Sequence, residues 1–101
     1  MSSLKTEIEL ANAIDAIVTE DTLTVNLDDG RTISVPLSWY PRLLYATGKE
    51  RNKYRLIGNG EGLHWPDLDE DISIKGLLSG HRSKESQSSL QKWLKKRKKD
   101  K

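Results

Sequence analysis

The sequence of 101 residues contains no cysteine, only 3 prolines and no long apolar run. Without cysteine it forms no disulfide, presents no thiolate nucleophile and offers no cysteine ligands to zinc. Residues 1–5 include no apolar run that could serve as a signal peptide, and no window approaches the roughly 20 apolar residues of a membrane span. We therefore expect a soluble protein in the cytoplasm, which is a reducing compartment.

Motifs of common enzyme chemistry are also missing. No Gly-x-Ser-x-Gly nucleophile motif occurs, and the glycine-dense segment 58–62 leads into a predicted strand, whereas a phosphate-binding loop opens a helix. His64 has no second histidine near it in sequence, and we expect it to face outward or to be hydrogen-bonded. We therefore predict no catalytic residue and no cofactor, and we expect the protein not to be an enzyme.

Three carboxylates, Asp67, Asp69 and Asp71, have the spacing of the first ligands of a calcium loop. The rest of that loop is absent, because Ile72 stands where glycine is needed and Leu78 where the bidentate glutamate is needed. We interpret the segment as an acidic turn whose charges favour the N-terminus of the next helix, and we predict no metal site. The alternative, a small-molecule or metal enzyme, predicts a pocket around His64 and residues 67–71.

What the sequence does have is a strong asymmetry of charge. Residues 1–80 hold 8 Lys/Arg against 13 Asp/Glu, a net of −5, whereas residues 81–101 hold 9 against 2, a net of +7. The total of +2 therefore hides an acidic body with a basic tail. We predict a loose lead-in over 1–12, one compact domain over 13–80 and a flexible basic tail over 81–101.

The first half of that domain has the period-two pattern of half-buried strands. Apolar residues alternate with polar ones over 14–18, 23–27 and 33–35, and in the first of these segments Ile14 is expected to face the core. Asp29-Gly30 predicts a hairpin turn in which both residues have positive φ. The sequence thus predicts a three-stranded antiparallel meander.

The second half of the domain alternates helix and strand signals. Ser38 is expected to cap a helix that contains Pro41 in its first turn, and Thr47 and Glu50 have the form of a capping box for a short helix through about residue 52. Short strands are predicted over 54–58 and 63–65, and then a helix capped by Ser73 and stopped by Gly80. The predicted fold class is α+β: a meander, a helix, two short strands, a short helix and a basic tail.

Aromatic residues stand at the junctions of these elements. We interpret Trp39 and Tyr40 as plugs at the end of a small core, with an exposed aromatic contact patch as the alternative. Trp65 is also expected in the core, because a sheet this small needs bulky side chains.

The tail contains the clearest functional signal. After the hydrophilic segment 81–89, an apolar stripe recurs at helical spacing on an otherwise basic segment, and it would be only marginally helical on its own. The residues that we expect to bind a partner or nucleic acid are Leu90, Trp93, Leu94, Lys95, Lys96, Arg97, Lys98 and Lys99.

Several interpretations of the tail stay open. Dense cations bind phosphate backbones by counterion release, and Trp93 could stack on a base. Leu90, Trp93 and Leu94 could instead anchor a helix in an acidic partner's groove. Binding to a membrane surface needs a broader apolar face, and a disordered solubilising end is the plain alternative. Binding to phosphate should weaken steeply with salt, whereas groove binding should depend on the three apolar anchors.

Two segments carry a resemblance to a known family. These are Trp39-Tyr40-Pro41-Arg42-Leu43 and the His-Trp-Pro…Asp-Ile-Ser motif that begins at His64. Together with the hairpin, from about Asp15 to Gly80, they resemble the bacterial domain of unknown function family 2442. The resemblance implies a compact α+β module, with members often encoded beside another small protein in toxin–antitoxin-like pairs and some fused to a helix-turn-helix. Residues 81–101 are too short for that motif.

The leading hypothesis is therefore a non-enzymatic, antitoxin-like protein that binds a small toxin-like partner. Its acidic body would speed the encounter with a cationic partner, and its tail would order on binding. The rival is a nucleic-acid-binding transcriptional regulator that uses Lys95 to Lys99 as a phosphate clamp, as a dimer through an exposed sheet edge.

Overall fold

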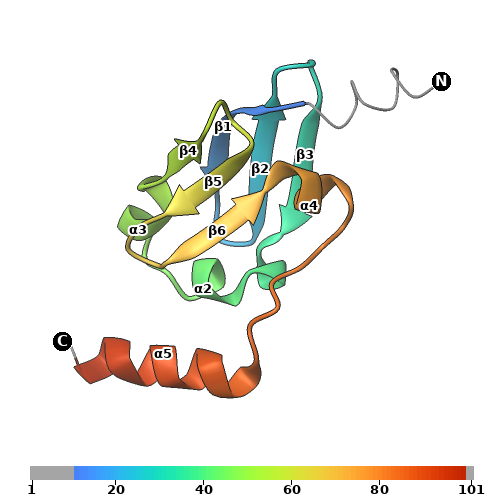
Figure 1. Cartoon of the computed structure of the whole chain (residues 1–101). Coiled ribbons are helices and arrows are strands. Elements are labelled where there is room, and N and C mark those ends of the chain that lie inside the picture. The colour runs from blue at the N-terminus through green and yellow to red at the C-terminus, as the bar shows by residue number, and fades with distance from the viewer. Residues whose placement is uncertain (1–10, 100–101) are drawn as a thin grey trace.

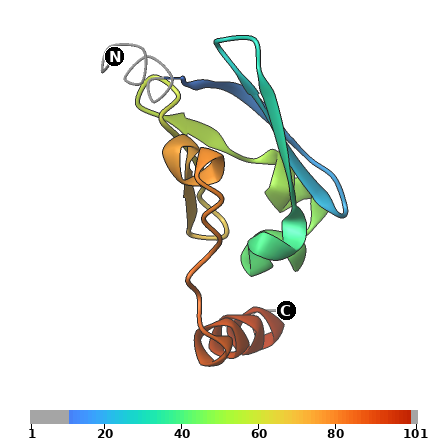
Figure 2. The same ribbon diagram turned by 90° about the vertical axis from the view of Figure 1, so that its right-hand side faces the viewer.

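The computed structural model describes residues 11–99, with the side chains of Lys98 and Lys99 outside that description. Two three-stranded antiparallel sheets, of order β1-β2-β3 and β4-β5-β6, lie opposite each other in the predicted α+β class (Figures 1 and 2). No helix among these residues is long and apolar enough to cross a membrane. In chain order the elements are β1 (Ala13–Val18), β2 (Thr22–Leu27), β3 (Thr32–Pro36), η1 (Leu37–Trp39), α2 (Pro41–Leu44), α3 (Gly48–Asn52), β4 (Arg55–Ile57), β5 (Gly62–Trp65), β6 (Glu70–Ser73), α4 (Ile74–Leu78) and α5 (Gln87–Lys99).

Strand β1 interrupts its alternation with a β-bulge between Ala13 and Asp15. The extra residue, Ile14, is 57% exposed, so the prediction that it faces the core is wrong. A bulge inserts one residue and shifts the pairing that follows it, which brings Ala16 opposite the buried Val25. The apolar set of β1 is therefore split between core and surface.

The β2–β3 turn also differs from the prediction. Of the two residues expected at positive φ, only Gly30 has it, at 93°. The turn is longer than two residues, and the N–H of Leu27 donates to the carbonyl of Arg31 at 2.8 Å. Asp29 accepts from the backbone N–H of Arg31 at 3.1 Å and from its guanidinium Nε at 2.8 Å, which lowers the pKa of the Asp29 carboxyl. A longer loop needs the left-handed conformation at only one position.

Two helix caps were predicted between the sheets, and one of them is correct. Ser38 caps no helix: it lies within the 3₁₀ turn η1, and α2 begins at Pro41 without a side-chain cap. The capping box at α3 is present, with the N–H of Glu50 donating to Thr47 Oγ1 at 3.1 Å and the N–H of Thr47 donating to Glu50 Oε1 at 2.9 Å. Pro41 takes the first helical position, where a missing N–H has no cost.

The second sheet has three strands where two were predicted. Strand β6 pairs with β5 in antiparallel register, with Ile72 opposite Leu63. Its four residues contain a single apolar side chain, so the pattern gave too little alternation to indicate a strand. Ser73 then caps α4 as predicted, accepting from the N–H of Gly76 at 2.9 Å, and the helix ends before Gly80.

The core lies between the two sheets. Trp65 is fully buried, its Nε1–H donates to the carbonyl of Arg51 at 3.0 Å, and its ring lies 5.9 Å from that of Tyr54, which confirms the core interpretation. Tyr40 is buried as well, whereas Trp39 is half-buried with the Arg82 guanidinium 4.7 Å from its ring. The largest fully buried side chains are Trp65, Leu23, Leu37, Leu43, Leu63, Leu68, Ile74 and Val25.

Gly60 joins the edges of the two sheets. The N–H of Ala13 donates to the carbonyl of Gly60 at 2.6 Å. A Cβ at residue 60 would stand 2.2 Å from the Ala13 carbonyl oxygen, and the residue has a φ of 100°. Only glycine fits so close an approach of two backbones.

Candidate binding site at helix α5

Helix α5 lies at the end of a segment over residues 81–86 that has no regular secondary structure (Figure 1). It begins at Gln87, three residues before the predicted apolar stripe, and it contains no acidic residue. Leu90 is only 6% exposed, and Trp93 packs against the hydrophobic core of the body. The stripe therefore faces the protein's own body. The flexibility predicted for 81–101 stays a prediction.

The first attachment of this segment is the ion pair between Arg42 of α2 and Glu85. Arg42 donates from Nε and Nη2 to the two carboxylate oxygens, both at 2.8 Å, and from Nη1 to the carbonyl of Leu68 at 3.0 Å. The two side chains are only 18% and 9% exposed. These hydrogen bonds lower the pKa of Glu85, so both groups are charged at neutral pH.

The second attachment joins the far end of α5 to α3. Arg97 donates from Nη1 and Nη2 to the Glu50 carboxylate at 2.9 and 2.8 Å. The same carboxylate accepts the N–H of Thr47, so one side chain completes the capping box and also holds α5. The hydrogen bonds from Arg97 lower the pKa of Glu50 to about 2.

Trp93 lies between these two attachments along the helix. The guanidinium carbon of Arg42 is 5.2 Å from the centre of its ring, and that of Arg97 is 4.5 Å away. Cations over an indole ring are attracted by its negative face. The ring for which stacking on a base was one open interpretation is thus in contact with two arginines of its own chain.

The remaining predicted binding residues divide by exposure. Lys95 and Lys96 are exposed, whereas Leu94 is half-buried. Lys92, which was not among the predicted binding residues, is exposed as well, and no described carboxylate forms an ion pair with any of these three lysines. The six predicted residues whose side chains are described do not share one face: Leu90, Trp93 and Arg97 contact the body, and Lys95 and Lys96 are exposed. The side chains predicted at Lys98 and Lys99 lie outside the described ones.

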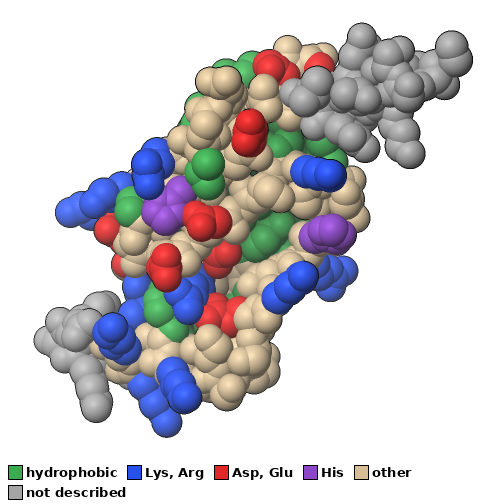
Figure 3. All heavy atoms as spheres, viewed as in Figure 1, with side chains coloured by type: hydrophobic (Ala, Val, Ile, Leu, Met, Phe, Trp, Pro, Cys, Tyr) green, Lys and Arg blue, Asp and Glu red, His purple; other side chains and the backbone are tan. Residues whose placement is uncertain are grey.

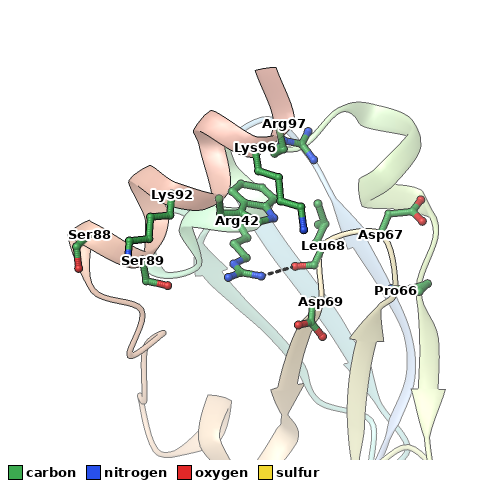
Figure 4. A pocket seen from close by; sticks show the side chains of 11 residues that line it. Arg42, Pro66, Asp67, Leu68, Asp69, Ser88, Ser89, Lys92, Lys96 and Arg97 are labelled. Atoms are coloured by element: carbon green, nitrogen blue, oxygen red, sulfur yellow. Dashed lines mark hydrogen bonds between the residues drawn. The ribbon is translucent and has the colours of Figure 1, made fainter. Parts of the chain in front are cut away.

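A pocket of about 670 Å³ opens between α5 and the loop that joins β5 to β6 (Figure 4). Lys92 and Lys96 extend from the helix, and the facing wall carries Asp67 and Asp69 (Figure 4). The pocket is lined by Arg42, Pro66, Asp67, Leu68, Asp69, Ser88, Ser89, Lys92, Trp93, Lys96 and Arg97.

Asp67 and Asp71 of the acidic turn are paired with different residues. Asp67 lies 3.4 Å from Lys53 Nζ, and Asp71 is paired with His64 Nδ1, which makes that histidine a hydrogen-bonded residue, as expected. Within residues 11–99 no three histidine or acidic side chains are grouped so that they could hold a metal ion. Acidic side chains gather over β5 and β6, and basic ones over α5 (Figure 3).

Sequence reasoning missed most of this site. Arg42 and Glu85 are separated by 43 residues, and Glu50 and Arg97 by 47, so no local spacing connects either pair. From the sequence, Glu50 was recognised only as part of the capping box with Thr47. Ser88 and Ser89 were placed in the linker, although a serine-rich run before an apolar stripe is typical of a helix start and could have moved the boundary.

No curated protein matches the chain. A crystal structure of a protein of unknown function from Rhodospirillum rubrum is 27% identical, with a TM-score of 0.63, and the match covers 79% of this chain and 96% of that one. A solution NMR structure of an uncharacterized protein from Chromobacterium violaceum is 21% identical, with a TM-score of 0.64, covering 90% and 86%; this likeness shows the fold alone. The model of the family described as Protein of unknown function (DUF2442) matches residues 13–83, which is most of the chain and ends before α5, and the chain therefore belongs to that family.

Proposed function

We propose that this protein is a non-enzymatic binding protein that holds nucleic acid on the basic face of helix α5. The observation that carries the proposal is how the helix divides its residues. Its apolar side chains Leu90 and Trp93 contact the protein's own body, while Lys92, Lys95 and Lys96 are exposed. An ordered row of lysines without acidic neighbours on the helix favours contact with phosphates.

This division argues against the tail as a helix that lies in a partner's groove. Such a helix presents its apolar anchors to the partner. Here Leu90 is 6% exposed, and the half-buried Trp93 packs against the body and has the guanidinium groups of Arg42 and Arg97 over its ring. To serve as anchors, these residues would first have to leave their present contacts.

The experiment is fluorescence anisotropy with labelled duplex and single-stranded oligonucleotides over a series of salt concentrations. Three lysines that contact phosphates give a slope of log affinity against log salt of about −2 to −3. The triple variant K92Q/K95Q/K96Q is compared with K49Q/R55Q/K75Q, which removes the same charge from exposed positions on the body. We expect a loss of at least about tenfold for the first and less than about threefold for the second.

Equal losses in the two triple variants would contradict a binding face on α5. Absence of binding by the unmodified protein at low salt would refute the proposal altogether.

A second candidate function is an antitoxin-like protein that binds a small cationic partner encoded beside it. It is favoured by apolar side chains exposed on an acidic body: Ile14 and Ile17 of β1 are each 57% exposed, and residues 1–80 have a net charge of −5. Native pull-downs with tagged full-length protein, with and without nuclease, test it. A single stoichiometric protein that is still recovered after nuclease treatment, and is not recovered with the I14D/I17D variant, would support this function. Loss of all recovered protein after nuclease treatment would exclude it as the main role.

A further inference from the structure

The pocket beneath α5 is lined by more than the lysines that the proposed function uses. Its volume of about 670 Å³ is in the range of small-molecule sites. The α5 wall consists of residues at helical spacing, with Ser88 and Ser89 one turn before Lys92 and Lys96 one turn after it. The two hydroxyls already have partners, since Ser89 Oγ donates to Glu85 Oε2 at 2.8 Å and Ser88 Oγ is hydrogen-bonded to Ser86 Oγ at 3.2 Å. The groups that this helix face offers to a ligand are therefore the two ammonium groups.

The charges in this pocket are not all available to a ligand. Arg42 is held by Glu85 and Arg97 by Glu50, so each guanidinium already has a carboxylate partner. Lys92 and Lys96 have no ion-pair partner among the described carboxylates and are the cations that a ligand meets. An anion of compact size, such as a phosphate, is the group that two neighbouring ammonium ions bind best.

The opposite wall has a different chemistry. It consists of Pro66, the buried Leu68, and the carboxylates Asp67 and Asp69. Asp67 lies 3.4 Å from Lys53 Nζ, whereas Asp69 forms no ion pair with a described cation. A free carboxylate accepts hydrogen bonds from hydroxyl or amino groups and repels a second phosphate.

We infer that this pocket binds a single nucleotide, with its phosphate between Lys92 and Lys96 and its sugar or base donors toward Asp69. The inference rests on the proposed function and deepens it. It assigns one nucleotide to a specific site in the pocket, in addition to the non-specific attraction of the lysines for a phosphate chain. The nucleotide can be free or can be the terminal unit of a strand, since both offer the same phosphate and hydroxyl groups.

The test is a titration of the full chain with adenosine 5′-monophosphate, adenosine and inorganic phosphate, followed by ¹H–¹⁵N NMR. We expect the nucleotide to bind more tightly than either part and to shift the indole N–H of Trp93 and the amides of residues 66–69. K92Q/K96Q should weaken nucleotide binding at least about tenfold, whereas K49Q/K75Q, which removes the same charge from exposed positions on the body outside the pocket, should change it less than about threefold. D69N should lower the preference for the nucleotide over inorganic phosphate.

A strand with a 5′-phosphate and the same strand without it separate the two sources of the nucleotide. Tighter binding of the phosphorylated strand than of the same strand without its 5′-phosphate assigns the pocket to strand ends. Equal binding of the two strands, with the free nucleotide still shifting the 66–69 loop, assigns it to free nucleotides. Equal effects of the two double variants would overturn the nucleotide site in the pocket and leave the proposed function intact. Chemical-shift changes spread along α5 without the 66–69 loop would do the same. Failure of every strand to bind would overturn the proposed function, and failure of the free nucleotide as well would overturn both.

Discussion

The two regions of this molecule are held together by different forces. The body, residues 13–80, encloses large side chains such as Trp65 and Leu63 that are 0% exposed. Among the described side chains of helix α5, only Leu90 is buried to a comparable degree, and the helix is attached by two ion pairs, Arg42–Glu85 and Arg97–Glu50. The body should therefore respond mainly to the loss of apolar volume, and the docking of α5 to the loss of charge.

The magnitudes make the contrast sharper. Burying one large apolar side chain contributes about 1.5–3 kcal/mol, and the body has many of them. A helix of 13 residues is marginal by itself in water, so its order depends on docking. A charge-assisted hydrogen bond in a partly buried pair contributes about 1.5–3 kcal/mol at most. The docked and undocked states of α5 should thus differ by a few kcal/mol, well below the stability of the whole domain.

The largest effect is expected from emptying the core. Trp65→Ala should lower the free energy of unfolding of the body by about 3–5 kcal/mol, because it leaves a cavity and an unpaired Arg51 carbonyl. Urea unfolding followed by circular dichroism measures this. Trp39→Ala, at a half-buried indole, is the matched control and should cost clearly less. Similar losses in the two variants would contradict the comparison.

Trp93→Ala tests the other region. Removing the indole takes away the packing on the body and the contacts with Arg42 and Arg97, so docking should weaken by about 2 kcal/mol while the urea midpoint of the body stays nearly unchanged. Amide hydrogen exchange over residues 87–99 reports the docking. Leu94→Ala, at a half-buried position on the same helix, should have a smaller effect. Unfolding of the body together with α5 in W93A would show that the two regions are one unit.

Glu70 gives the body its own pH dependence. Burial raises the pKa of Glu70 from 4.5 to about 7, with Glu85 and Asp71 adding to the rise and Arg42 opposing it. Between these pH values the folded state binds more protons than the unfolded state, so stability should fall as pH rises from about 4.5 through 7. The fall should be about 1–2 kcal/mol, because solvent screens a carboxyl that is only partly buried. Urea midpoints across this range should be flatter in Glu70→Gln, and an unchanged slope would rule Glu70 out as its source.

The smallest effect is expected at the Arg97–Glu50 pair, with the opposite sign. The pKa of Glu50 is about 2 in the folded state against 4.5 ordinarily, so its contribution is complete above pH 4.5 and is lost as pH falls toward 2. Exchange over residues 87–99 should rise in this range by an amount that corresponds to about 1 kcal/mol. Arg97→Gln removes the pair but keeps the capping box at Thr47, and its α5 should lose this pH response. Retention of the response would assign it to another carboxylate.

Several local signals predicted the local structure correctly, although the cap expected at Ser38 and the positive φ expected at Asp29 did not form. The capping box at Thr47, the cap at Ser73 and the burial of Trp65 each depend on a few neighbouring residues and were correct. The bulge that turns Ile14 outward was not predictable, because a bulge is fixed by the pairing of two strands and not by the pattern of one. The contact of Arg42 with Glu85 was missed for the same reason, since only the complete fold brings them together.

The contact between Ala13 and Gly60 has a consequence for how the chain folds. Each sheet is a meander of consecutive strands, so each can pair from neighbouring segments of the chain. Joining residue 13 to residue 60 closes a much longer loop. The chain loses the corresponding conformational entropy before the core contacts between the sheets form and offset that loss. We expect the docking of the two meanders to limit the folding rate. A side chain at residue 60 should then slow refolding as well as lower stability, because it obstructs the step at which the two halves first meet.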